Sequence, residues 1–122
     1  MANEITVSLR AKVVNGNLTN EFNPGTLQIT QAAQGMYAPV VAVGTSEEDL
    51  LSPDVATPGI MCLRNLDATN YVDWGPKSGG SMVAVGRLKA GEVALIRIGS
   101  SVTIRWVANT ASVKVQVWML DS

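Results

Sequence analysis

Apolar and polar residues alternate with a period of two along most of this chain. In residues 5–13 every odd position is apolar, from Ile5 to Val13, and the even positions hold Thr, Ser, Arg and Lys. This alternation is typical of a β-strand with one apolar and one polar face. The strand is expected to end at Asn15-Gly16-Asn17, whose residue types favour a turn.

Further short strands are expected along the rest of the chain, separated by segments rich in Gly, Pro and Asn. Asn23-Pro24-Gly25 is predicted to be a second turn. The pattern then predicts strands at residues 26–30, 36–44, 59–65, 70–75, 81–88, 92–98, 102–108 and 112–120. Pro39 indicates that the strand at 36–44 lies at a sheet edge or contains a bulge.

Residues 45–51 form the one stretch with helical character. Ser46 precedes Glu47, Glu48 and Asp49, and a capping hydroxyl followed by acidic residues suits a helix N-terminus. Pro53 would end such a helix at once, so either a single short turn of helix or a structured loop is expected.

Eight or nine short strands at this spacing predict an all-β fold, an antiparallel β-sandwich with a jelly-roll-like arrangement. The length of 122 residues predicts one domain over residues 1–122. Residues 1–14 are expected to lie at a sheet edge or to exchange with a neighbouring chain. The long final strand is a second candidate for pairing with the sheet edge of a neighbour.

The composition predicts that the chain assembles with other chains. Hydrophobic residues make up 47% of it without counting 11 Gly, and charged residues only 16%, against about 25% in an ordinary soluble domain. So small a domain has little interior, and some apolar residues must therefore lie outside it. An apolar surface with few charges would aggregate unless partner chains cover it.

Charge and hydropathy argue against several partners. The net charge is −1, with 9 basic and 10 acidic residues, so neither nucleic acid nor an anionic membrane surface is expected as a partner. No apolar run approaches the roughly 18 residues of a spanning helix, and residues 1–4 lack the features of a secretory signal. The single cysteine, Cys62, is expected to be a buried structural thiol of a protein made in a reducing cytoplasm.

The residue types offer little for catalysis, so the chain is not expected to be an enzyme or to hold a cofactor or metal. It has no histidine, the commonest general base and metal ligand. No glycine-rich phosphate loop is present. The only acidic cluster is Glu47-Glu48-Asp49, which is interpreted as a solvated helix cap.

The final strand suggests an interface. If Val113, Val115, Val117 and Met119 face the core, then Trp118 and Leu120 point outward. An outward Trp is a good interface anchor, although a loop or the N-terminal segment could cover it instead.

Three more residues are interface candidates. Trp74 lies beside a turn, whereas Trp106 shares a face with apolar residues and is expected in the core. Arg87 and Arg97 alternate with apolar neighbours. Such arginines are expected to pair with carboxylates across a subunit contact or to lie at its rim.

Five phrases between Val43 and Asp121, about two-thirds of the chain, resemble small virion proteins of tailed bacteriophages, of the head-decoration or minor structural type. They are Thr45–Leu50, Pro58–Gly59, Arg64–Val72, Arg87–Leu95 and Ala108–Val115. The resemblance implies a jelly-roll-like sandwich on the capsid surface of the virion, synthesised in the host cytoplasm. It implies no catalysis. Proteins of this kind are often homotrimers that act as cement between neighbouring subunits of the major capsid protein.

Three alternatives stay open at the level of sequence. The chain could be a tail or head–tail junction component. It could be a carbohydrate- or receptor-binding β-module, for which the pair Asp73-Trp74 is a weak indication. A small hydrolase is the least favoured, because histidine and a carboxylate pair are both missing.

Overall fold

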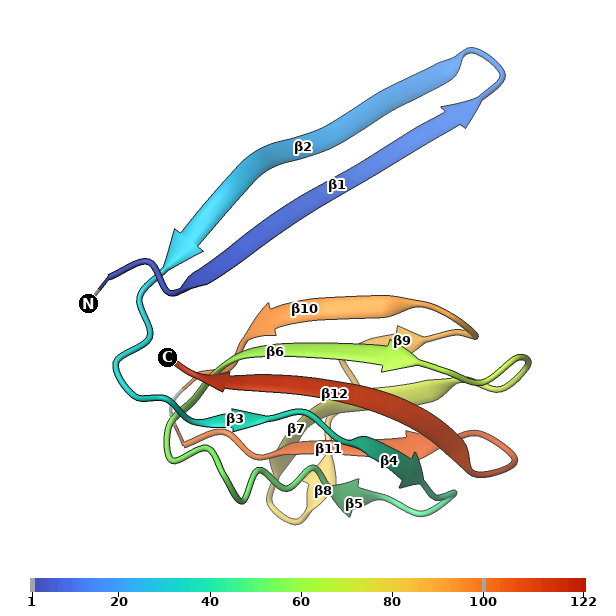
Figure 1. Ribbon diagram of the computed structural model, residues 1–122. Helices are drawn as coiled ribbons and strands as arrows, with labels where there is room; N and C mark the ends of the chain where they lie inside the picture. Colours follow the sequence, from blue (N-terminus) through green and yellow to red (C-terminus); the bar gives the residue numbers. More distant parts are fainter. Residues whose placement is uncertain (1, 100) are drawn as a thin grey trace. The chain divides into compact units, whose positions relative to one another are not determined.

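The computed structural model describes residues 2–99 and 101–122, and the described chain is built from β-strands without a helix (Figure 1). The described chain folds as two compact units, whereas the sequence predicts one domain over residues 1–122. The hairpin unit comprises the chain up to Ala33 together with Ser122, and the sandwich unit comprises Gln34–Asp121. Each unit is described by itself.

The hairpin unit is one long antiparallel pair. Strand β1 (Ile5–Asn15) pairs with β2 (Leu18–Ile29) across the predicted turn, where Gly16 takes a φ of 56° that suits glycine. The prediction of a second turn at residues 23–25 and a separate strand after it is wrong, because β2 runs straight through. A bulge opposite residue 10 accommodates Pro24, which lacks the N–H that a regular ladder needs.

The sandwich unit has two five-stranded sheets whose pairs are all antiparallel. The first sheet has the order β10-β6-β12-β3, with β4 also on β12, and the second has the order β5-β11-β7-β8, with β9 also on β7. The strands are β3 (Met36–Tyr37), β4 (Val40–Val43), β5 (Glu48–Asp49), β6 (Pro58–Asn65), β7 (Val72–Ser78), β8 (Ser81–Met82), β9 (Gly86–Leu88), β10 (Val93–Arg97), β11 (Ile104–Ala108) and β12 (Val113–Asp121).

The core lies between the two sheets. The valines of β12 and Met119 point into it from the first sheet, and Trp106 and Val72 point into it from the second. Both expectations, the inward valine face and the buried Trp106, are confirmed. The all-β antiparallel sandwich is confirmed as well, whereas a jelly-roll arrangement of its strands remains a prediction.

Three predicted elements differ in detail. Of the two alternatives for residues 45–51, the helical turn is wrong, because the segment is a loop that contains the two-residue strand β5, which pairs with β11. The strand at 36–44 is divided into β3 and β4 around Pro39, at the edge of the first sheet as its proline indicates. The strand at 81–88 is likewise divided into β8 and β9, and Val83 and Val85 between them are exposed.

The segment after β6 is held by side-chain amide and carboxylate groups. Asn65 is fully buried, and its Nδ2 donates to the carbonyls of Asn70 and Leu88. Asp67 accepts hydrogen bonds from the backbone N–H groups of Thr69 and Asn70, a side-chain-to-backbone pattern that is typical of a turn. These N–H donors lower the pKa of the Asp67 carboxyl. The phrase Arg64–Val72 therefore determines a turn of the fold.

Candidate assembly surfaces

The hairpin unit carries an apolar face without cover along most of its length. Residues paired in register lie on the same face of the ribbon. The apolar residues of that face, here called the ribbon face, are Ile5, Val7, Leu9, Ala11, Val13, Leu18, Phe22, Leu27 and Ile29, and Asn15, Asn20 and Gly25 lie on the same side. Phe22 and Leu27 are 53% and 58% exposed, although Ile5 is buried. Exposed apolar patches of this extent usually mark a contact surface.

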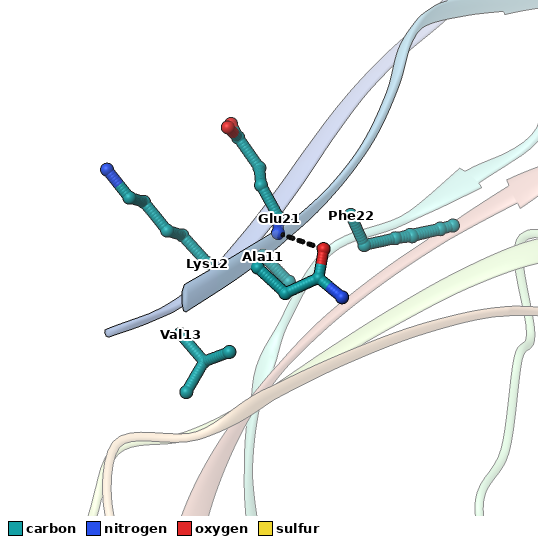
Figure 2. Close-up of a pocket in the computed structure, with 6 residues that line it drawn as sticks. Ala11, Lys12, Val13, Glu21 and Phe22 are labelled. Atoms are coloured by element: carbon teal, nitrogen blue, oxygen red, sulfur yellow. Dashed lines mark hydrogen bonds between the residues drawn. The ribbon is translucent and has the colours of Figure 1, made fainter. Parts of the chain in front are cut away.

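The opposite face of the hairpin is polar. Arg10 forms an ion pair with Glu21, and the hydroxyls of Ser8 and Thr26 lie 3.3 Å apart. Figure 2 shows Lys12 and Glu21 on one side of the ribbon and Val13 on the other. This exposed ion pair contributes little stability.

A two-stranded hairpin alone is marginally stable in water. The alternation of the two faces is therefore that of a ribbon made to lie on another surface, with its polar side left to solvent. A shallow hollow of about 350 Å³ between Val13 and Phe22 interrupts the apolar side near its end (Figure 2).

The sandwich unit has a second apolar surface, on the side of the first sheet that faces away from the core. The register puts Trp118, Cys62 and Leu95 in one row across β12, β6 and β10. This outer sheet face consists of Val40, Cys62, Arg64, Val93, Leu95, Arg97, Gln116 and Trp118. A hollow of about 360 Å³ lies beside Trp118, between it and Val93.

The outer sheet face brings together two of the predicted interface residues. Trp118 points outward and is 37% exposed, so its predicted orientation is confirmed. Arg97 is exposed on β10, opposite Ile60. Leu120 points to the same side, but only 6% of it is exposed, and the expectation of an exposed side chain is wrong there. In register it lies between two apolar residues, Ile60 and Met36.

Cys62 also differs from its prediction. It is half-buried, because its position on β6 alternates with the core residues Met61 and Leu63 and puts the thiol on the outer sheet face. Its partial burial raises the pKa of the thiol.

Trp74 does not lie at a surface. It is 7% exposed and belongs to the core, because Val72 and Trp74 alternate inward along β7. A β-carbon at Gly86 would lie 2.5 Å from the indole ring, so glycine is needed there. The prediction that Trp74 contacts a partner is therefore wrong for this structure.

Arg87 is exposed, but it already has partners within the chain. Its Nε lies 2.7 Å from Asp73 Oδ1, and its guanidinium lies 3.9 Å from the centre of the Tyr71 ring. The hydrogen bond to Asp73 raises the pKa of Arg87. The carboxylate that pairs with Arg87 thus lies on the neighbouring strand of the same chain, and a place for Arg87 at an interface stays a prediction.

A charged cluster that the sequence did not indicate links β5 to the strands β11 and β7 of the second sheet. Arg105 Nε lies 2.7 Å from Asp49 Oδ1, and its Nη1 lies 3.3 Å from Glu47. Lys77 Nζ lies 3.7 Å from Asp49. The Arg105 hydrogen bond lowers the pKa of Asp49. Glu47 and Asp49 are thus paired with cations rather than capping a helix, and Glu48 accepts a hydrogen bond from the backbone N–H of Gly44.

Within the described residues, no three side chains of His, Cys, Asp or Glu come together in a way that could hold a metal ion. No helix of the described chain is long and apolar enough to cross a membrane.

The fold and surfaces define an all-β protein with an amphipathic hairpin, an antiparallel sandwich and two exposed apolar faces. No family model, curated protein or solved structure matches this chain.

Proposed function

We propose that this chain is a non-enzymatic structural protein of a tailed-bacteriophage virion, which decorates the capsid and stabilises it by bridging neighbouring subunits of the major capsid protein. The observation that carries the proposal is the uncovered apolar face of the hairpin. A long ribbon with one apolar side is suited to lie across a protein surface, and it has no evident use in a protein that acts alone.

The sandwich unit supports this role with an exposed apolar face of its own, the outer sheet face. A cement protein gains affinity by touching several copies of a repeating shell, so modest contacts add up through avidity. It needs apolar contact area and a net charge near zero, and this chain has both. The resemblance of the phrases from Thr45 to Val115 to head-decoration proteins points to the same role, commonly as a homotrimer.

The carbohydrate-binding alternative is less well supported by the site geometry. Such a module needs exposed aromatic rings beside carboxylates, but Trp74 and Trp106 are in the core. Trp118 has Arg64 near it in its hollow and no carboxylate among the residues that line that hollow.

The proposal is tested by mixing the purified protein with undecorated capsids of the same phage and separating bound from free protein by sedimentation. We expect saturable binding and capsids that resist heating to a higher temperature. Leu27→Asp, which puts a charge on the ribbon face, should weaken binding at least tenfold. Thr26→Asp, one residue away on the polar face, is the matched control and should bind as the parent does.

Electron microscopy of the decorated particles then gives the position. Occupancy of three-fold or quasi-three-fold sites supports capsid cement, whereas a ring at the portal vertex would favour the head–tail junction instead. A protein that ignores capsids at high concentration would overturn both.

A further inference from the structure

We infer that the ribbon face of one copy lies on the outer sheet face of a second copy, so that each chain lends its hairpin to a neighbour. This inference deepens the self-association that the proposed function contains, and it names the two surfaces that meet.

The two surfaces match in chemistry. The ribbon face has no charged side chain among its nine residues. The outer sheet face has an apolar middle row of Trp118, Cys62 and Leu95. Its cations lie outside that row, Arg97 on one side and Arg64 with Lys114 on the other. An apolar centre with a charged margin is the usual anatomy of a protein interface. Neither described face contains a carboxylate, so no buried ion pair is required of the contact.

The length of the hairpin favours a second copy. β2 has 12 residues, which span about 40 Å at roughly 3.4 Å per residue. The sandwich unit has about 90 residues, so its diameter is about 30 Å. β6 has only 8 residues and spans about 27 Å. The ribbon is thus longer than the sheet of a single sandwich unit, so one unit cannot cover all of it and more than one copy is needed.

The contact area is sufficient for a stable oligomer. A ribbon about 40 Å long and about 10 Å wide covers roughly 400 Å², from the strand dimensions. Two copies that exchange ribbons with each other therefore each lose about 800 Å², the standard size per partner; in a ring each copy loses the same area, divided between two neighbours at about 400 Å² each. Such a head-to-tail contact closes into a ring if its rotation permits, in keeping with the homotrimer proposed above.

One side chain offers a detailed fit. Phe22 is the largest residue of the ribbon face and is exposed. The hollow of about 360 Å³ beside Trp118 is open on the outer sheet face and mainly apolar. Insertion of Phe22 would place two aromatic rings together, an arrangement that stabilises interfaces beyond the burial of area alone.

Cys62, the only cysteine of the chain, provides the test because it lies beside this hollow. The double variant Phe22→Cys/Cys62→Ser is mixed with the parent protein and treated with diamide, the oxidant, at a pH of about 9, so that the exposed thiol at position 22 ionises and attacks. A disulfide between residue 22 and Cys62 can then form only between two chains. We expect a covalent dimer in the mixture whose linked peptides, identified by mass spectrometry, contain both positions.

The matched control is Thr19→Cys/Cys62→Ser, three positions along the same strand on the polar face. It should give less than a tenth of that product. Leu27→Cys/Cys62→Ser is a second probe on the ribbon face, which keeps the test decisive if the Phe22 variant folds poorly. The single variant Phe22→Cys keeps Cys62 and so distinguishes a contact within one chain from a contact between two chains. An intrachain disulfide in a monomer would show that the ribbon covers its own sandwich unit and would overturn the inference.

The same preparations are tested for capsid binding. Cross-linking without capsid binding would remove the proposed function and keep this interface. Capsid binding without any link from either ribbon position would remove the interface and keep the function, with the capsid as the occupant of the ribbon face.

Discussion

The buried amide of Asn65 should be among the most sensitive positions of the sandwich unit. Its Nδ2 donates to the carbonyls of Asn70 and Leu88 at 2.9 Å each, and its Oδ1 accepts from the backbone N–H of Asp67 at 2.8 Å. The side chain is 0% exposed. One residue thus joins the loop after β6 to the end of β9.

Replacement of Asn65 by Ala removes all three hydrogen bonds. A buried polar group left without a partner costs about 1–3 kcal/mol. The groups of Asn70 and Asp67 are only partly buried, so water can reach them and about 1 kcal/mol each applies, whereas the buried carbonyl of Leu88 should cost about 2 kcal/mol. The expected loss is about 4 kcal/mol, a large part of the roughly 4–13 kcal/mol typical of a unit of this size.

The loss is measured by urea unfolding followed by tryptophan fluorescence. All 3 tryptophans, Trp74, Trp106 and Trp118, belong to the sandwich unit, so the signal reports this unit alone. Thermal unfolding should show a midpoint lower by on the order of 15–30 °C.

The control is Thr110→Val, which removes the exposed hydrogen bond from the Thr110 hydroxyl to Asn70 Oδ1 in the same region. It should cost below about 1 kcal/mol. If Asn65→Ala unfolded within about 1 kcal/mol of the parent with an unchanged urea dependence, the amide would not be holding the loop as argued.

Three further outcomes are expected. Gly75→Ala should prevent stable folding of the sandwich unit, because its β-carbon would lie 1.9 Å from the carbonyl oxygen of Val83, whereas Gly44→Ala meets nothing within 4 Å and should leave the unfolding midpoint nearly unchanged. The lowered pKa of Asp49 means that its ion pairs stabilise the fold above the unfolded pKa and lose that effect as the pH falls below about 4; Asp49→Asn should therefore flatten the acid side of a stability–pH curve measured by urea unfolding. Removal of the chain up to Ala33 should leave a folded sandwich with the blue-shifted fluorescence of buried tryptophan, and red-shifted emission would contradict the division into two units.

Much of the sandwich could be predicted because its alternation reflects burial directly. Each strand of a two-sheet sandwich has one side in the core. The spacing alone therefore predicts which way the valines of β12 and Trp106 point. The same spacing cannot tell how much of the other side is covered. Trp118 and Leu120 both point outward, yet one is partly exposed and the other is buried.

The helical alternative for residues 45–51 is wrong because a contact with a distant part of the chain outweighs the local preference for a helix start. Ser46 and the acidic run satisfy the pattern of a helix start, but Asp49 pairs with Arg105, 56 residues away in the chain. Two cations, Arg105 and Lys77, hold these carboxylates at the sheet edge. A sequence window around the acidic run contains neither of them.

The hairpin shows the limit of alternation most clearly. Residues 5–13 would have the same pattern whether their apolar side packed in this chain's core or against another chain, since alternation reveals two faces and not what covers them. Composition carries the missing information in part: a chain too apolar for its own interior must expose the excess somewhere. The exposed residues of the ribbon face and the outer sheet face, Phe22, Leu27 and Val93 among them, hold a large part of that excess, and Val14, Leu51 and Val85 are exposed elsewhere. Each copy of the chain has one ribbon face and one outer sheet face, so every face of one kind can meet a face of the other kind, which is a reason to look first for contacts between copies.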